Sequence, residues 1–219
     1  MISARQALER LRDGNRRFVA VRSARNPVAS QARRSELVAG QEPFAIILGC
    51  SDSRVPAELV FDQGFGDLFV IRVAGNIVAP SQIGSVEFAA ARFGTRLVVV
   101  LGHSQCGAVG ATLEELLGHA TTESKNLRSI VDRVRPAVEP LLEGPLRADA
   151  DVLMREAVLA NVRASVGQLR QGSDLLERLI ETDGLVVVGA EYSLETGLVS
   201  FFDGVQHRRP PTGFKSSSP

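Results

Sequence analysis

Four short apolar runs interrupt a chain that is otherwise mixed in polarity. They are rich in valine, isoleucine and leucine, and they lack the alternation of a strand that exposes one face. Continuous runs of this length are typical of strands buried on both faces, as in a parallel sheet covered by helices. The sequence therefore predicts buried strands at residues 44–48, 68–73, 97–101 and 185–188.

Helix-compatible stretches lie between these runs. The order is strand, helix, strand, helix, strand, several helices and a last strand, which indicates an α/β fold with right-handed crossovers. We expect a central, mostly parallel four-stranded sheet flanked by helices, with an antiparallel edge strand at 198–202. Helices are expected at 4–20, 56–62, 81–93, 107–119, 125–139 and 147–182, the last broken near 172–174.

The N-terminal stretch is predicted to be an extended amphipathic helix. Leu8, Leu11, Asn15 and Phe18 recur at helical spacing, with charged side chains between them. The C-terminal stretch 208–219 is rich in proline and serine and is predicted to be a flexible tail. We expect a single domain at 1–207, because a chain of 219 residues can bury one sizeable core.

Composition narrows the class of protein. There are 25 acidic and 25 basic residues, so the formal net charge is zero, which argues against nucleic acid or a membrane surface as partner. The N-terminus is charged where a secretory signal is apolar, and no run approaches a membrane span of about 20 apolar residues, so we expect a cytoplasmic location. Two cysteines in a reducing compartment favour a metal or catalytic role.

Both cysteines and one histidine come just after predicted strands. Cys50 follows the run 44–48, and His103 and Cys106 follow the run 97–101. In an open α/β sheet such strand ends share one crevice, so the three side chains are expected to converge. Two thiolates and an imidazole, with a fourth position left for water, form a known catalytic zinc arrangement.

Each ligand has a simpler interpretation when taken alone. Cys50 fits a small buried apolar residue equally well, and His-x-x-Cys is short enough to occur by chance. Together the three favour zinc, and an open site, because His119 and His207 have no second candidate ligand beside them. Cys106 also opens a predicted helix, whose N-terminus would favour its thiolate.

Asp52 and Arg54 lie two residues apart in the loop after Cys50. An arginine fork can hold a carboxylate in a charge-assisted pair, and a fixed carboxylate beside zinc can accept the hydroxide proton and orient the oxygen. The alternatives are a structural salt bridge or a helix N-cap by Asp52 or Ser53.

These motifs resemble those of the β-class carbonic anhydrases. The two closest blocks are Cys-Ser-Asp-Ser-Arg-Val at 50–55 and Gly-His-Ser-Gln-Cys-Gly-Ala at 102–108. Further similarity covers 11–18, 62–72 and 74–76, so the resemblance spans most of residues 8–110 and, more weakly, 189–204.

The resemblance implies reversible hydration of carbon dioxide to bicarbonate by attack of zinc hydroxide, with Asp52 paired to Arg54. It implies one zinc ion per subunit, held by Cys50, His103 and Cys106. It also implies a homodimer or homotetramer in which the arm 1–40 packs on a partner subunit. A narrow substrate pocket near the subunit interface is implied for Gln41, Phe69, Ala74, Phe88 and Gly107.

One departure from the family concerns regulation. Some bacterial members hold an inhibitory bicarbonate with a tryptophan three residues before the first metal cysteine, where this chain has Ile47. A closed state in which Asp52 becomes a fourth zinc ligand remains open. His119 and His207 are candidate proton shuttles, although both fit surface histidines better.

Three other functions stay open at this point. The first is hydrolysis of carbonyl sulfide or carbon disulfide on the same fold. The second is a non-catalytic zinc-binding protein whose site is closed by Asp52. A thiol redox role for Cys50 and Cys106 is weaker, because they do not form a Cys-x-x-Cys pair.

Overall fold

The computed structural model describes residues 2–21, 31–122 and 124–205. The predicted tail at 208–219 and His207 lie outside these residues. Within them, no helix is both long and apolar enough to cross a lipid bilayer. The cytoplasmic location and the extent of the single domain stay predictions.

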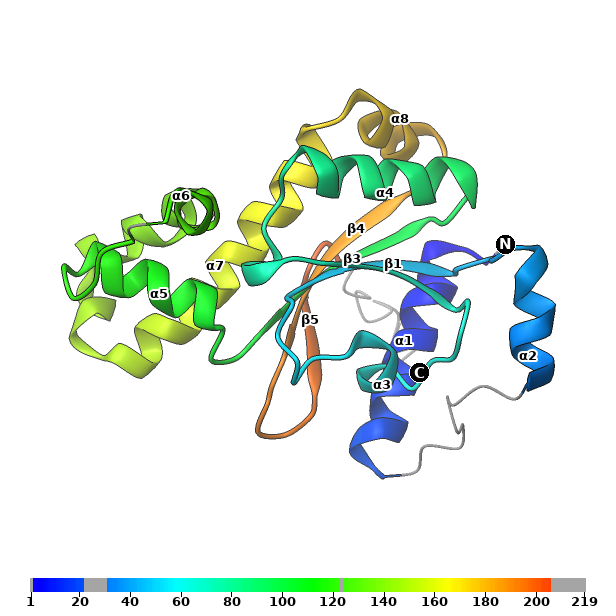
Figure 1. Cartoon of the computed structure of the whole chain (residues 1–219), viewed down its shortest axis with the longest axis horizontal. Coiled ribbons are helices and arrows are strands. Elements are labelled where there is room, and N and C mark those ends of the chain that lie inside the picture. The colour runs from blue at the N-terminus through cyan, green and yellow to red at the C-terminus, as the bar shows by residue number, and fades with distance from the viewer. Residues whose placement is uncertain (1, 22–30, 123, 206–219) are drawn as a thin grey trace, which may run out of the picture.

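A twisted sheet of five strands forms the centre of the described chain, in the order β2-β1-β3-β4-β5 (Figure 1). The first four strands run parallel to their neighbours, and β5 pairs antiparallel with β4. This confirms the predicted α/β architecture. The strands are β1 (Ala45–Gly49), β2 (Leu68–Arg72), β3 (Leu97–His103), β4 (Val186–Tyr192) and β5 (Val199–Asp203).

The helices follow the predicted order with small shifts at their ends. The predicted break in the long C-terminal helix is present, because Ser173 caps a new helix by accepting a hydrogen bond from the backbone N–H of Leu176. The helices are α1 (Ala4–Val19), α2 (Gln31–Glu36), α3 (Ala57–Val60), α4 (Pro80–Arg92), α5 (Gly107–Leu116), α6 (Lys125–Val138), α7 (Ala150–Gln171) and α8 (Asp174–Thr182), with short 3₁₀ turns η1 (Leu37–Ala39), η2 (Ala74–Asn76), η3 (Glu139–Glu143) and η4 (Pro145–Ala148).

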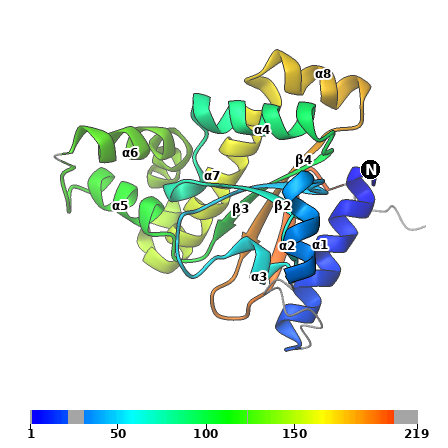
Figure 2. The same ribbon diagram turned by 45° about the vertical axis from the view of Figure 1, so that its right-hand side comes forward.

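Helices cover both faces of the sheet, which explains the uninterrupted apolar runs. Helices α1 and α3 lie on one face, and α4, α7 and α8 pack on the other (Figures 1 and 2). On β3, Val98 and Val100 face one layer while Val99 faces the other, and all three are fully buried. Each strand face is therefore a core face, so no position in the run can be polar.

Helix α1 packs on its own chain. Leu11 is fully buried in the cluster beneath the sheet. Asn15 donates to the carbonyl oxygens of Val60 and Gly197 and accepts from the N–H of Val199, so it ties α1 to α3 and to the start of β5. A contact between the arm 1–40 and a partner subunit stays a prediction.

At Gly14, helix α1 lies very close to the backbone of Phe61. A Cβ atom added there would lie 1.8 Å from the carbonyl oxygen of Phe61, a backbone atom that cannot rotate away. We predict that Gly14→Ala lowers the free energy of unfolding by about 2–3 kcal/mol, as overpacked sites do. Urea unfolding followed by circular dichroism measures the change.

Gly84 provides the matched control. It is an exposed glycine inside helix α4, and a Cβ atom added there meets nothing within 4 Å. Gly84→Ala should be neutral or stabilising by up to about 1 kcal/mol, because alanine has the higher helix propensity. Equal stability of the two variants would show that α1 is not docked as described.

Candidate metal centre

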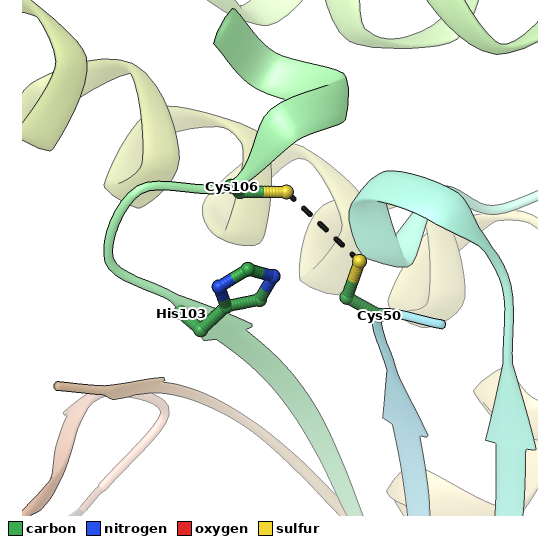
Figure 3. Close-up of side chains that lie close together, drawn as sticks. All are labelled: Cys50, His103 and Cys106. Atoms are coloured by element: carbon green, nitrogen blue, oxygen red, sulfur yellow. Dashed lines mark hydrogen bonds between the residues drawn. The ribbon is translucent and has the colours of Figure 1, made fainter. Parts of the chain in front are cut away.

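Two loops at the carboxyl ends of neighbouring parallel strands bring Cys50, His103 and Cys106 together (Figure 3). Gly49 is paired in register with Leu101, so the residues that follow β1 and complete β3 emerge side by side. Cys50 directly follows β1, His103 is the last residue of β3, and Cys106 is the N-cap residue of α5. His103 was expected just after its strand and instead ends it, because β3 continues its pairing with β4 as far as Tyr192.

The three side chains have the geometry that a tetrahedral metal ion needs. The two sulfur atoms are 4.0 Å apart, and the three ligand atoms all lie within 4.8 Å of one another. Zinc–sulfur bonds of about 2.3 Å at tetrahedral angles place two sulfurs about 3.8 Å apart. The spacing therefore fits zinc with little adjustment.

The surroundings of the His103 imidazole favour its role as a metal ligand. Its ring is fully buried, and Nδ1 lies 2.9 Å from the carbonyl oxygen of Ser104, which orients Nδ1 as the donor. Nε2 is buried and has no hydrogen-bond partner within the described chain. A buried polar atom without a partner is costly, and a metal ion bound by the Nε2 lone pair would remove that cost.

The two thiols differ in acidity. The Cys106 thiol as hydrogen-bond donor lowers the pKa of Cys50, burial opposes this, and His103 and the N–H of Gly75 lower it further. The same contact with Cys50, together with burial, raises the pKa of Cys106. The site without metal thus favours one thiolate and one thiol, and a dication would displace the remaining proton.

The raised pKa of Cys106 differs from the prediction that its helix N-terminus favours the thiolate. The position is as predicted, since Cys106 caps α5, and the N–H groups of Val109 and Ala108 do lower its pKa. Their effect is smaller than that of the Cys50 sulfur and of burial. The sequence predicted that the two sulfurs converge, but it did not indicate which of them would keep its proton.

Asp52 and Arg54 form a two-point ion pair beside the three ligands. Arg54 donates from Nε to Oδ1 at 2.9 Å and from Nη2 to Oδ2 at 2.6 Å. These hydrogen bonds hold the pKa of the Asp52 carboxyl well below its usual range. Oδ2 also lies 3.8 Å from Nε2 of His103, so the carboxylate faces the position of a metal ion.

The alternative that Asp52 or Ser53 caps the following helix α3 does not occur. The N-cap position of α3 is Pro56, and it has no side-chain hydrogen bond. Asp52 instead accepts from the backbone N–H of Arg54. Arg54 also donates to the carbonyl oxygen of Gln105 at 3.4 Å, so it connects the loop of Cys50 with the loop of Cys106.

Arg72 is a site residue that the sequence analysis missed. From the end of β2 it donates to the carbonyl oxygen of Cys50 at 3.1 Å and to that of Asp52 at 2.6 Å. It therefore holds the backbone of the first metal loop from the neighbouring strand. Arg72 ends the stretch 62–72 that resembles the family, but an arginine that binds backbone carbonyls leaves no spacing pattern that would reveal its role.

The five predicted pocket residues fall into two groups. Ala74 lies in η2, next to Gly75, which donates to the Cys50 sulfur, and Gly107 directly follows Cys106. Both therefore lie next to the metal centre. The other three, Gln41, Phe69 and Phe88, do not.

These three lie toward the opposite end of the first two strands. Gln41 precedes β1 whereas Cys50 follows it, so the length of the strand separates them. Phe69 is paired with Ile46 near the start of β1, and its ring lies 6.2 Å from that of Phe88 on α4. Within one chain, these side chains are not brought to Cys50.

The comparisons with known proteins agree with this geometry. A model of the carbonic anhydrase family matches residues 45–199. This span contains both metal loops, strands β1 to β4 and the first residue of β5. The chain belongs to the β-carbonic anhydrase family. It is a carbonic anhydrase, and hydration of carbon dioxide is the general activity of this zinc-using family.

Individual carbonic anhydrases extend the match over most of the chain. Carbonic anhydrase 2 of Mycobacterium tuberculosis is 40% identical over 191 residues, which cover 87% of this chain and 89% of that protein. Carbonic anhydrase of Mycolicibacterium smegmatis is 39% identical over 196 residues, covering 88% and 90%. The crystal structure of the β-carbonic anhydrase CafA of Aspergillus fumigatus aligns with a TM-score of 0.71 at 25% identity, covering 88% and 89%.

The remaining histidine candidate lies far from the metal centre of this carbonic anhydrase. His119 is exposed beyond the end of α5, whose ten residues extend about 15 Å from Cys106. Direct proton transfer over that distance is not supported. Ile47, which replaces the tryptophan of some bacterial members, is fully buried in the core beneath the sheet.

Glu191 is a second residue near the site that no motif indicated. It lies half-buried on β4, opposite Gly102. Burial raises the pKa of its carboxyl and Glu156 adds to the effect, against Arg155 and His103. The pKa of Glu191 is lower in the unfolded chain than in the folded one, so ionised Glu191 destabilises the fold. This loss of stability begins as the pH rises above the pKa of an unfolded glutamate, about 4.3.

We predict that Glu191→Gln raises Tm by about 1–3 °C at about pH 8, with a smaller gain at about pH 5. Glutamine keeps the size of the side chain and removes the charge. Scanning calorimetry at both pH values checks this, with Glu195→Gln, an exposed residue after β4, as the control. A lower Tm for Glu191→Gln at alkaline pH would mean that the carboxylate makes a favourable contact.

Proposed function

We propose that this carbonic anhydrase hydrates carbon dioxide reversibly to bicarbonate and a proton, with zinc held by Cys50, His103 and Cys106. The observation that carries the proposal is the convergence of these three ligand atoms, within 4.8 Å of one another, beside the Asp52–Arg54 ion pair. When bound, zinc would supply a Lewis acid that makes hydroxide available near neutral pH.

Asp52 orients the attacking oxygen. Its low pKa keeps it ionised, so it can only accept hydrogen bonds. An O–H group beside Nε2 of His103 would donate to the carboxylate, and this leaves an oxygen lone pair free to point at the carbon of the substrate. Arg54 fixes the carboxylate in that orientation from both oxygens.

Arg54 also keeps Asp52 away from the metal position. While Arg54 donates to both carboxylate oxygens, the carboxylate is held in the plane of the guanidinium and cannot turn toward the metal position. If this contact is broken, Asp52 is close enough to His103 to turn inward and become a fourth ligand. The open state therefore depends on the ion pair, and the closed state stays a proposal.

The surroundings of the cysteines suit a small, uncharged, linear substrate. Cys50 and Cys106 belong to a buried apolar cluster with Ile77, Val109 and Val134. This cluster excludes water behind the sulfurs and leaves the side of Asp52 for substrate. Carbon dioxide needs no charged binding group, and the apolar residues Ala74 and Gly107 lie beside that approach.

A homo-oligomer would give Gln41, Phe69 and Phe88 a role in substrate binding. They lie at the far end of β1 and β2 from Cys50, so they can line a metal pocket only if it belongs to a second copy of the chain. Two features support such an assembly. Strand β2 is an edge strand within the described sheet, and the adjacent Phe88 and Phe65 are about half exposed. The proposed assembly is a homodimer or a homotetramer.

Loss of one metal ligand tests the proposed function directly. We predict that Cys50→Ser loses stoichiometric zinc and that its rate of carbon dioxide hydration falls to the uncatalysed background, since serine is a poor zinc ligand. Stopped-flow hydration at mildly alkaline pH and metal analysis on the same sample measure both. Removing zinc from the wild-type protein with a chelator should abolish the activity, and adding zinc should restore it.

Activity without metal, in either sample, would contradict the proposal. Stoichiometric zinc without any hydration would instead favour a non-catalytic zinc-binding protein. Faster turnover of carbonyl sulfide or carbon disulfide than of carbon dioxide would assign the site to those substrates.

The role of Asp52 is tested by a change that keeps its shape. We predict that Asp52→Asn retains zinc but lowers kcat about 100-fold, because the amide has one acceptor oxygen where the carboxylate has two, so its NH2 group must face either Arg54 or the attacking oxygen. Asp13→Asn is the matched control: Asp13 is also paired with an arginine, Arg16, but it lies on the exposed face of α1. A wild-type kcat for Asp52→Asn would leave Asp52 a purely structural role.

A further inference from the structure

The turn η2 covers the Cys50 sulfur with a backbone N–H group. Gly75 donates from its N–H to the Cys50 Sγ at 3.4 Å. Gly75 has φ 70° and ψ 19°, and the next residue, Asn76, has φ 43°. Glycine adopts a positive φ at no steric cost, but a positive φ is unfavourable for Asn76, which carries a side chain. The turn therefore needs other contacts to keep this shape.

Helix α7 supplies these contacts from a distant part of the sequence. Asn161 donates from Nδ2 to the carbonyl oxygen of Gly75 at 2.8 Å. Ser165, one helical turn later, donates from Oγ to the carbonyl oxygen of Asn76 at 3.0 Å. Both side chains are only 2% exposed. They are polar residues on a helix face whose other members, such as Val158 and Val162, are apolar and buried.

A buried amide on such a face is unfavourable unless it makes its hydrogen bonds. Asn161 makes such a hydrogen bond to the carbonyl oxygen of Gly75, and the N–H of Gly75 contacts the Cys50 sulfur. The N–H and the carbonyl of Gly75 flank the same Cα atom, so fixing the carbonyl limits the rotation that would turn the N–H away. Ala108 packs closely against this turn, because a Cβ atom added to Gly75 would lie 3.1 Å from the Ala108 Cβ.

We propose that Asn161 is a positioning residue for the metal centre, which acts through Gly75 to keep an N–H hydrogen bond on the Cys50 thiolate. This inference rests on the metal centre of the proposed function. The hydrogen bond withdraws charge from the sulfur, so less charge is donated to the metal, which stays a stronger Lewis acid. Loss of groups that orient or polarise a metal ligand costs about 10–100-fold in affinity or activity.

The wild-type protein provides the first test. Cadmium-113 in place of zinc is an NMR-active probe of the two sulfur ligands. If the hydrogen bond is present, the Gly75 amide proton couples to the cadmium nucleus through the Cys50 sulfur, and the proton exchanges slowly with solvent. Absence of both the coupling and the protection in a protein that binds one cadmium per chain overturns the proposal.

The second test compares two neighbouring hydrogen bonds from one helix. Asn161→Leu removes the bond to Gly75 with little change in volume, and Ser165→Ala removes the bond to Asn76. With cobalt(II) in the site, the sulfur-to-metal charge-transfer band should move to lower energy in Asn161→Leu, because the sulfur regains charge, and should stay in place in Ser165→Ala. The zinc form of Asn161→Leu should show roughly a 10-fold lower kcat.

Equal band shifts in the two variants would indicate a general loosening of α7 and overturn the specific role of Asn161. An unshifted band in a folded Asn161→Leu protein overturns it as well. If Asn161→Leu does not fold, Asn161→Ala replaces it, and the wild-type cadmium coupling remains decisive for the hydrogen bond. Failure of the wild-type protein to bind metal or to hydrate carbon dioxide would instead refute the proposed function.

Discussion

The parallel pairing of β1 with β3 fixes the distance between the two halves of the metal centre. Cys50 lies one residue beyond the pair Gly49–Leu101, and His103 lies two residues beyond it. A shift of this register by one residue would turn every side chain of one strand to the opposite face of the sheet. Because both strands are buried on both faces, such a shift would press each valine and isoleucine into the core layer that is packed for its neighbours. The core thus determines where the sulfurs and the imidazole meet.

Charge at the site is balanced locally, although the chain as a whole is neutral. Asp52 and the Cys50 thiolate bring negative charge to one edge of the sheet, and Arg54 and Arg72 surround the loop that carries them. The two arginines have different structural roles. Arg54 binds the side chain of Asp52, and Arg72 binds backbone carbonyls, so one fixes the carboxylate and the other fixes the loop. A bound dication would enter a site whose ligands are already oriented.

Much of this could be predicted from the sequence, because the relevant signals are local. Uninterrupted runs of valine, isoleucine and leucine located the parallel strands, and Gly172 with Ser173 located the break between α7 and α8. Cys50 and His103 could be placed together because each lies at the end of such a run. Local patterns also favoured the Asp52–Arg54 pair, since the two residues are separated by a single position.

The contacts that escaped prediction join residues far apart in the chain. Arg72 and Asn161 bind backbone carbonyl oxygens, which every residue has, so neither partner is marked by a residue type. The meeting of Cys50 and Cys106 was predicted, but the raised pKa of Cys106 was not, because it depends on the contact with the Cys50 sulfur and on burial in the folded chain. Gln41, Phe69 and Phe88 were grouped with the metal ligands by resemblance, and only the strand direction shows that they lie at the other end of β1 and β2.

The hydrogen bonds of Asn15 have a consequence for how the protein acquires its structure. They link α1 to Val199, which is 184 positions further along the chain. During synthesis, helix α1 is made before β5, and its docking surface is complete only after β5 has been made. Until those further 184 residues exist, this chain does not cover the whole apolar face of α1. Contacts of such long sequence separation slow folding and expose intermediates to aggregation. Helix α1 is therefore among the last elements to complete its native contacts.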